Sequence, residues 1–363
     1  NQPAKIVFPA FTREYRYNAR GWKVLEQDIP SADEVHSTGF TYDPAGNLLT
    51  RDDSEGRRTG YFYDDLERLR MVSDAEGHDT RYAYDNRDNL IELTDANGNR
   101  TLFAHDRNNL AVKETRPMGE ELLTEYNALG YPARIVDAKG QEVRYDYDIR
   151  GKISTVRYFA ATNLSEPVKT VTFAYDEAGN LTGYDDGVTS AVYRYDAMNR
   201  PMAESVDYGA FILSSSTAWY GNGAKKSFTG PDGITYDYDY DANNQLSSIA
   251  IPGQGFVTIN AYRWLRPASL SLPGGTTREF SHDALMRTLG IESRDPAGNS
   301  LLSHRYTFDR MDNVVSKTTE HGTYDYDYDR LYRLIRGERP EAPAEAYSYD
   351  GVGNRLTAAD TSG

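Results

Sequence analysis

Apolar and polar residues alternate along most of this chain, and short clusters of Asp, Asn and Gly interrupt the alternation at regular intervals. Aromatic residues stand two positions apart in Tyr61/Tyr63 and Tyr82/Tyr84, which places both members of each pair on the same face of a β-strand. Turn-forming clusters come every ten or eleven residues, leaving strands of about six residues, a usual length. The pattern predicts an all-β chain of many short strands.

The strongest regularity is a phrase of the form aromatic-x-aromatic-Asp-x-x-Gly-x-Leu. Its Asp, or the residue in its place, recurs at 43, 64, 85, 106, 127 and 148, a constant step of 21 residues. A fixed period of this kind is the signature of a repeat architecture. Counted loosely, the phrase occurs sixteen times, including a worn copy at Trp219-Tyr220-Gly221 and another at Tyr262-Arg263.

Each phrase predicts a turn. Asp opens the turn by accepting hydrogen bonds from the backbone two residues on, and the residue three positions after it should adopt a left-handed conformation. That position is Gly in six copies and Asn or Asp in five, the residue types that tolerate this conformation best. A second turn, as in Asp74–Gly77 and Asp137–Gly140, falls midway through each period.

Each 21-residue unit is therefore expected to be a β-hairpin, and successive units to form one continuous antiparallel meander. Open twisted sheets rarely exceed ~10 strands without curling or splitting. A ribbon of about thirty strands is thus expected to curl on itself, with one face concave. We expect residues 1–363 to be a single segment of this kind, cut from a longer chain. The residues assigned to the structural repeat motif are Tyr42, Asp43, Gly46, Tyr63, Asp64, Tyr84, Asp85, Tyr147, Asp148, Gly151, Tyr175, Asp176, Gly179, Tyr195, Asp196, Tyr240, Asp241, Tyr328, Asp329, Tyr349, Asp350 and Gly353.

Composition narrows the functions that the chain could have. The net charge is −15, which disfavours a nucleic-acid partner. The sequence has no cysteine, so disulfides, thiolate metal sites and a cysteine nucleophile are unavailable. No apolar run is long enough to span a membrane, and the first residues do not lead into a signal-peptide core.

Several groups of residues suggest a binding function, but a structural role explains each of them more simply. Asp237, Asp239 and Asp241, and likewise Asp325, Asp327 and Asp329, alternate with tyrosines and could place three carboxylates on one face for Ca²⁺. A solvated outer face explains them better. Rows of Tyr and Trp could stack sugar rings, but packing within the sheet accounts for them more simply. His105 and His282 occupy the Tyr position of the phrase, so each is interpreted as a packing residue. No catalytic, cofactor-binding or metal-binding residue is assigned.

The phrase Tyr-x-Tyr-Asp-x-x-Gly-Asn-Leu at this spacing, as in Tyr175-Asp176 to Leu181, resembles the RHS (YD) repeat proteins. These include bacterial polymorphic toxins, the cage-forming part of Tc toxins and the corresponding region of teneurins. The resemblance covers nearly the whole chain. RHS toxins usually carry an Asp-Pro-x-Gly motif in a self-cleaving segment. Asp43–Gly46 and Asp295–Gly298 match that string but fall in repeat turns, so no catalytic role is given to them.

The resemblance implies that the curled ribbon is part of a hollow shell or spiral barrel. It implies a non-enzymatic shell segment that encapsulates a C-terminal toxin or cargo domain until delivery, as in interbacterial competition. It implies a bacterial, exported or secreted protein. The expected partners are the remainder of its own polypeptide, the enclosed toxin domain and components of a secretion or delivery system, with no nucleic acid, no membrane span and no cofactor. The alternative is a carbohydrate-binding or cell-surface adhesion module, with a glycan partner that would be recognised through Trp219 or Trp264. An enzyme ranks third.

Overall fold

The computed structural model describes residues 2–360, and in them the chain forms 33 β-strands and one short 3₁₀ turn, η1 (Pro273–Gly275), with no α-helix. The strands follow one another as an antiparallel meander in a single sheet. The prediction of an all-β meander of short hairpins is therefore confirmed.

The strands are three to nine residues long. In the first part of the chain they are β1 (Lys5–Val7), β2 (Thr12–Tyr17), β3 (Lys23–Ser31), β4 (Glu34–Tyr42), β5 (Leu48–Asp52), β6 (Arg58–Tyr63), β7 (Leu69–Ser73), β8 (Asp79–Tyr84) and β9 (Leu90–Thr94). In the middle they are β10 (Arg100–His105), β11 (Ala111–Thr115), β12 (Glu121–Tyr126), β13 (Pro132–Val136), β14 (Glu142–Tyr147), β15 (Ile153–Phe159), β16 (Lys169–Tyr175), β17 (Leu181–Asp185), β18 (Ser190–Tyr195), β19 (Pro201–Asp207), β20 (Ile212–Trp219), β21 (Lys225–Thr229), β22 (Thr235–Tyr240) and β23 (Leu246–Ile251). The last are β24 (Gly255–Arg263), β25 (Arg266–Ser271), β26 (Thr277–His282), β27 (Thr288–Arg294), β28 (Ser300–Phe308), β29 (Val314–Thr319), β30 (Gly322–Tyr328), β31 (Leu334–Arg339), β32 (Ala342–Tyr349) and β33 (Arg355–Asp360).

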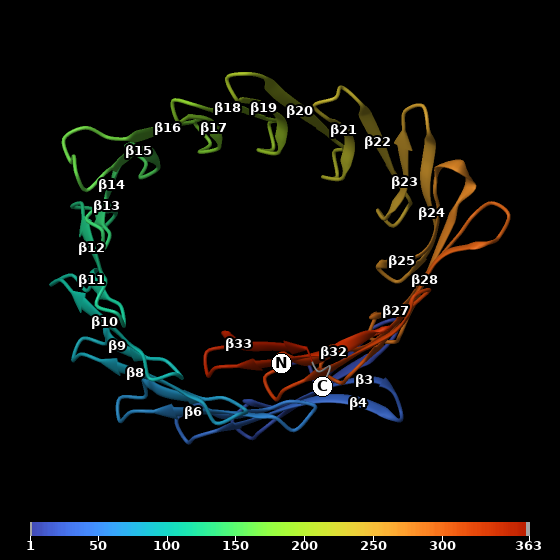
Figure 1. Cartoon of the computed structure of the whole chain (residues 1–363), viewed down its shortest axis with the longest axis horizontal. Helices are drawn as coiled ribbons and strands as arrows, with labels where there is room; N and C mark the ends of the chain where they lie inside the picture. Colours follow the sequence, from blue (N-terminus) through green and yellow to red (C-terminus); the bar gives the residue numbers. More distant parts are fainter. Residues whose placement is uncertain (1, 361–363) are drawn as a thin grey trace. The chain divides into compact units, whose positions relative to one another are not determined.

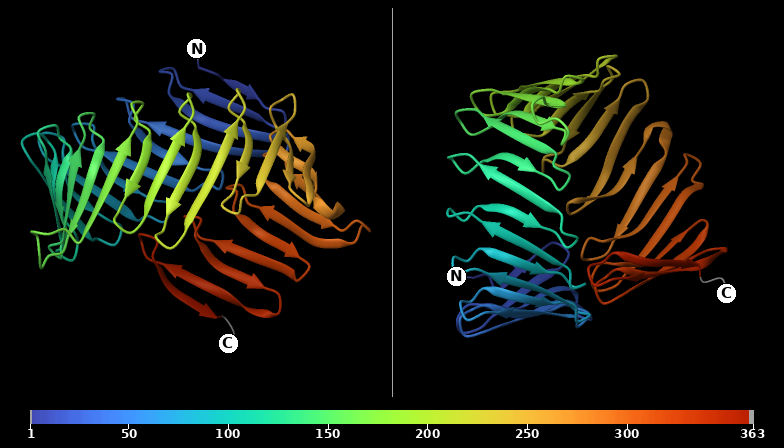
Figure 2. Two further views of the ribbon diagram at one scale, coloured as in Figure 1. Left: turned by 90° about the horizontal axis from the view of Figure 1, so that it is seen from above. Right: turned by 60° about the vertical axis from the view of Figure 1, so that its left-hand side comes forward.

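The chain divides into two compact units. Unit 1 contains the residues up to 83, residues 93–99 and those from 257 onward, and unit 2 contains residues 84–92 and 100–256. Within unit 2, the hairpins from β10 to β23 stand side by side along an arc (Figure 1). Their turns form two rows, one at each edge of the sheet (Figure 2). The predicted curl is therefore present within unit 2.

The hairpin that joins β4 to β5 illustrates the local geometry of the repeat. The Asp43 amide donates to the Asn47 carbonyl (3.0 Å) and the Gly46 amide to the Asp43 carbonyl (3.3 Å). The strand register shifts between Thr41 and Tyr42, so that Tyr42 lies opposite Leu48. A tight turn followed by a left-handed residue that forms a bulge is a common hairpin connection. The same shift precedes the phrase tyrosine in β6, β14, β18 and β30.

Two copies of the phrase depart from the prediction. In the worn copy near Trp219, the sequence predicts that the turn opens at Gly221, but it opens one residue earlier. The Tyr220 amide donates to Ala224, and the amide of Gly223, which has a positive φ, donates to Tyr220. At Arg263 no repeat turn forms. Instead β24 and β25 join through a two-residue tip in which Trp264 has a φ of 55°.

The sheet is a single layer in each unit, and its core is thin (Figure 2). Only four apolar residues among those described are buried, namely Val156, Phe159, Ala191 and Met286. The accessible surface is 21905 Å², whereas a compact protein of this mass would expose roughly 15,000 Å². The fold is therefore held by contacts between neighbouring hairpins rather than by a central core.

Candidate functional site: two rows of turns and the seam between them

Two kinds of turn alternate along the sheet. We call the turn opened by the phrase Asp a YD turn, and the turn halfway through the period a mid turn. In a meander the two kinds lie at opposite edges, so that each edge carries a row of one kind. The rows are where the chain presents its most regular polar chemistry.

The phrase Asp organises the YD turn through both carboxylate oxygens. Asp43 Oδ1 accepts from the amides of Ala45, Gly46 and Asn47 at 2.8–2.9 Å, and Oδ2 accepts from the Asn47 side chain at 2.9 Å. These hydrogen bonds stabilise the charged form. The side-chain hydrogen bond from Asn47 is the largest cause of a pKa of Asp43 below its usual value, although partial desolvation opposes it. In other copies the residue four positions after the phrase Asp is Arg instead of Asn. Arg333, for example, donates a hydrogen bond from Nε to Asp329 Oδ2 at 2.6 Å.

The third residue after the phrase Asp has a positive φ, whether or not it is glycine. Gly46, Gly151 and Gly353 show it, and so do Met286 and Tyr332. A left-handed conformation costs a residue with a Cβ roughly 1–2 kcal/mol. Met286 is buried and Tyr332 makes contacts with a distant turn, described below, so neighbouring contacts offset the strain.

The phrase Tyr commonly links a hairpin to the one before it. Its hydroxyl donates to the carbonyl of the residue that follows the preceding YD turn, five positions after that turn's Asp. We call this contact a rung. The rungs are Tyr42 to Lys23, Tyr126 to Ala111, Tyr147 to Pro132, Tyr175 to Ile153, Tyr195 to Leu181, Tyr328 to Val314 and Tyr349 to Leu334, at 2.7–3.0 Å. The sequence indicated aromatic packing at these positions but not this hydrogen bond.

Four other residues occupy the Tyr position, and one of them, Phe308, has no hydroxyl or N–H group to donate. Trp219 preserves the rung, because its indole Nε1 donates to the Pro201 carbonyl at 2.8 Å. His105 and His282 do not. In both, Nδ1 is buried without a hydrogen-bond partner. Burial is the main cause of a lowered pKa of His282, and Arg266 and Arg263 add to it. Both histidines are therefore embedded in the sheet, in agreement with their interpretation as packing residues.

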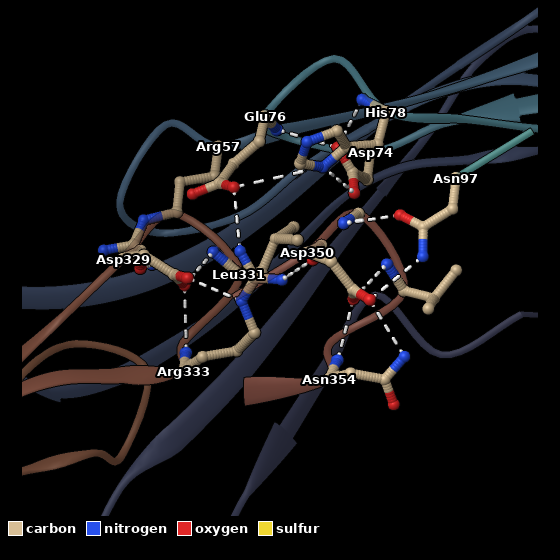
Figure 3. Close-up of polar contacts among 12 residues, drawn as sticks. Arg57, Asp74, Glu76, His78, Asn97, Asp329, Leu331, Arg333, Asp350 and Asn354 are labelled. Carbon is tan, nitrogen blue, oxygen red and sulfur yellow. Dashed lines mark hydrogen bonds and ion pairs between the residues drawn. The ribbon is translucent and has the colours of Figure 1, made fainter. Parts of the chain in front are cut away.

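Unit 1 contains a contact between the two kinds of row that no sequence pattern indicated. Mid turns between β3 and β10 meet YD turns between β26 and β33. The close-up in Figure 3 shows the part of this contact that involves the turns at Asp329 and Asp350. We call this contact the seam. The residues that meet across it are 253 to 279 positions apart in the sequence.

The mid turn that opens at Asp53 meets the YD turn that opens at Asp329. Arg57 donates from Nη1 to the Asp329 carbonyl at 2.6 Å, and its guanidinium lies 4.1 Å from the centre of the Tyr332 ring. The Tyr332 hydroxyl donates to Asp53 Oδ2. Desolvation by burial and this hydrogen bond raise the pKa of Tyr332. Tyr332 therefore combines a strained backbone, a cation–π contact and a charged hydrogen bond.

Further contacts follow along the seam. Arg333 pairs with Glu76 at 2.9 Å, while its Nη1 donates to the Asp350 carbonyl of the next YD turn at 3.0 Å. Asn97 donates to Asp350 Oδ2 at 3.0 Å and accepts from the Gly351 amide at 3.0 Å (Figure 3). The YD turn at Asp329 thus contacts two consecutive mid turns, and the rows interlock in register.

Backbone packing and charge both tighten the seam at this end. A Cβ on Gly351 would lie 3.0 Å from the Ala96 carbonyl oxygen, so a side chain there would push the two turns apart. Hydrogen bonds from Asn354 and, across the seam, from Asn97 lower the pKa of Asp350 to about 2, against an opposing effect of desolvation. Burial would raise the pKa of Asp329, but hydrogen bonds from Arg333 outweigh it and the pKa is lowered.

Unit 2 contains one fully buried carboxylate, on the face opposite the rungs. Glu142 is 1% exposed and pairs with Arg134 and with Arg144 (2.7 Å). Arg144 also lies 4.0 Å from the centre of the Phe159 ring and donates to the Leu164 carbonyl at 3.1 Å. The connection between β15 and β16 therefore covers this cluster. The hydrogen bond from Arg134 is the main cause of a pKa of Glu142 of about 2, although burial opposes it and Arg144 assists.

The candidate ligand sites have ordinary surroundings. Where the structure describes side chains, no group of three or more His, Asp or Glu is placed to hold a metal ion, so the Asp237 and Asp325 rows form no such cluster. Trp264 packs against Phe8 with ring centres 5.7 Å apart, and Trp219 forms a rung.

No helix among the described residues is long and apolar enough to span a membrane. Asp295 forms a mid turn, with its carboxylate bound by Ala297 and Asn299.

Residues 70–213 and 104–331 match the family described as teneurin YD-shell, and together these matches span more than half of the chain. The chain belongs to the teneurin YD-shell family. Residues 42–79 also match the RHS repeat. The resemblance inferred from the repeated phrase is thus confirmed, and this YD-shell chain is a structural shell element. Curated protein sequences gave no match.

Solved structures share the fold of this YD-shell chain. A crystal structure of TcdB2-TccC3-Cdc42 has a TM-score of 0.74 at 15% identity and covers 98% of this chain and 24% of the other. A Tc holotoxin pore from Photorhabdus luminescens has a TM-score of 0.71 at 15% identity, over 96% of this chain and 23% of the other. TcdB2-TccC3 without its hypervariable C-terminal region has a TM-score of 0.57 at 14% identity, over 97% and 26%. The chain spans about a quarter of the length of these proteins.

Proposed function

We propose that residues 1–363 form one segment of the wall of a YD-repeat shell, and that this wall encloses and shields a C-terminal toxin or other cargo domain until delivery. The seam is the observation that carries the proposal. A single-layer sheet can act as a barrier only if its edges are joined, and the seam joins an early row of mid turns to a late row of YD turns by paired side chains. The likeness to Tc toxin structures supports the toxin context.

The segment acts by enclosure and not by catalysis. Its most regular carboxylates, those of the YD turns, are occupied by backbone amides and by the Asn or Arg four residues later, as at Asp43 and Asp329. A carboxylate held ionised in this way is suited to fixing a turn and is a poor general base. The wall would keep the cargo from its target and from proteases.

Other residues of the same polypeptide would complete the shell, since this chain spans only about a quarter of its structural neighbours. In this proposal the polypeptide is bacterial and exported, and its partners are the enclosed domain and the components that deliver it. Glycan binding has no comparable support, because Trp219 and Trp264 are engaged within the fold.

A protease-protection assay tests the proposal. A small protease-sensitive reporter domain is fused after Gly363 and digested in three forms. These are the intact chain, a chain with Tyr332→Ala and Arg333→Ala that breaks the seam, and a control with Arg194→Ala and Arg305→Ala, which changes two charges outside the seam. We expect the reporter to be cut more slowly in the intact and control fusions than in the seam variant. Equal digestion in all three would refute shielding by this wall.

A further inference from the structure

His282 places a titratable base inside the sheet, at the end of β26 and directly before the YD turn that opens at Asp283. The residue is only 6% exposed, and among the described residues its Nδ1 has no hydrogen-bond partner. The Tyr or Phe found at this position in other copies takes up no proton near neutral pH. A proton taken up by Nδ1 would create a buried N–H group without an acceptor, which is unfavourable.

The charged groups around His282 also disfavour a protonated ring. Arg263, the last residue of β24, donates from Nη1 to the His282 carbonyl, and Arg266 begins the neighbouring strand β25. On the other side, β27 places the uncharged Thr288 opposite His282. Burial, followed by the positive charges of Arg266 and Arg263, lowers the pKa of His282, and the carboxylate of Asp283 opposes them in part.

The YD turn that follows His282 is tied to its surroundings through Arg287. The guanidinium of Arg287 pairs with Asp283 within the turn and donates from Nη1 to the Asp309 carbonyl of the next YD turn at 2.9 Å. Across the seam, Arg287 Nη2 lies 3.5 Å from Glu34 Oε1, in the hairpin that joins β3 to β4. A local opening that exposes His282 to water would therefore also displace Arg287 and break a contact of the seam.

We propose that His282 is an acid-sensitive trigger, and that a proton taken up at its Nδ1 loosens the YD turn at Asp283 and this end of the seam. In the opened turn, water hydrates the charged ring. Because the pKa of His282 is lower in the closed turn than in the opened one, the closed turn is fully stable above the usual histidine pKa of 6.5 and loses stability as the pH falls below it. A use of this loosening in cargo release rests on the proposed function.

Hydrogen exchange read by mass spectrometry on peptides from β26 and β27 measures how often this turn opens, once the intrinsic pH dependence of exchange is corrected for. His282→Phe removes the base and keeps an aromatic ring, as Phe308 does in the next copy of the phrase. Arg266→Gln keeps the histidine and removes a neighbouring positive charge. The matched control is His105→Phe, which removes a second histidine with a buried, unpartnered Nδ1, in unit 2.

Between pH 7.5 and 5.5 we expect opening to increase about 3- to 10-fold in the wild type and in His105→Phe, since one proton is taken up on opening. The increase should be smaller in Arg266→Gln and absent in His282→Phe. The other histidines are common to these proteins, so the difference isolates His282. A wild type whose opening does not change, or an equal increase in His282→Phe, would overturn the proposal. If His282→Phe does not fold, an undiminished increase in Arg266→Gln would overturn it as well.

The reporter fusion separates this inference from the proposed function. Its digestion is measured at pH 7.5 and at pH 5.5, each relative to the free reporter at the same pH. We expect protection of the wild-type fusion to fall at pH 5.5 and that of the His282→Phe fusion to persist. Protection of both fusions at pH 5.5 would overturn a role in release and leave shielding intact. No protection at pH 7.5 would refute shielding, while the exchange measurement would still decide whether His282 loosens the seam.

Discussion

Glu142 offers the clearest measure of how much a single ion cluster contributes to a sheet with so thin a core. The perturbation is Glu142→Gln, which keeps the shape of the side chain and removes its charge. Its partners Arg134 and Arg144 then lose the carboxylate that neutralises them on the covered face of unit 2. Removing one partner of a buried pair is costly, because the remaining charge is left without compensation.

The magnitude follows from the pKa of Glu142, which lies at about 2 instead of the usual 4.5. That difference corresponds to roughly 3 kcal/mol. Arg134 and Arg144 are 33% and 37% exposed, so solvent screens part of the interaction and we expect a loss of about 2 kcal/mol at neutral pH. Because the pKa in the folded state is lowered, this stability is present above about pH 4.5 and is lost as the pH falls towards 2.

Hydrogen exchange read by mass spectrometry on peptides from β13 to β15 is the appropriate assay, because repeat stacks unfold locally. Exchange should be about 30-fold faster in Glu142→Gln at neutral pH, which is the factor for about 2 kcal/mol, and wild type and variant should converge near pH 2. The control is Glu125→Gln, which removes the other, 62% exposed, partner of Arg134 and should change little. Equal effects of the two substitutions, or no effect at neutral pH, would refute the reasoning.

Three further outcomes are expected. Tyr147→Phe removes a rung and should destabilise its hairpin by about 1 kcal/mol, measured by local exchange in β13, while Tyr145→Phe, which alters a neighbouring tyrosine of the same strand, should cost less; equal losses would contradict the role of the rung. Gly351→Ala should open the end of the seam and expose the turn at Asp95–Gly98 to limited proteolysis, whereas Gly221→Ala, where a Cβ meets nothing within 4 Å, should be neutral. The pKa of Asp350 is lowered from 3.8 to about 2, so exchange at the same turn should stay slow above pH 4 and rise as the pH falls towards 2; a flat profile over that interval would count against the Asp350 contacts.

The hairpin of the repeat could be predicted from the sequence, because the interactions that form its turn join residues only a few positions apart. Local features are sufficient to determine the hairpin, without contacts to residues far away in the sequence. They are the carboxylate of Asp43, the left-handed conformation at Gly46 and the aromatic residues two positions apart. Local residues also explain why the turn after Trp219 was predicted one residue too late. Two adjacent aromatic residues left the register ambiguous, and the backbone closed the turn at Tyr220 with no carboxylate at all.

The rungs and the seam could not be predicted in the same way. A rung depends on the distance between a Tyr hydroxyl and a carbonyl of the preceding hairpin, which the spacing of residues does not determine. The seam joins residues more than 250 positions apart, and its members are ordinary turn residues in the sequence. Tyr332 is the one seam residue whose type is unusual in the sequence, because an aromatic residue occupies the left-handed position of the turn, where Gly or Asn is expected.

The most direct test of this account is the distance across the seam in solution. The sequence has no cysteine, so nitroxide labels can be placed at Ala75→Cys and Arg330→Cys, one on each of two turns that meet. Electron spin resonance should give a single short and narrow distance distribution, which becomes broad when Tyr332→Ala and Arg333→Ala are added. A broad distribution in the otherwise intact chain, unchanged by those substitutions, would show that the rows do not interlock and that the wall is not joined.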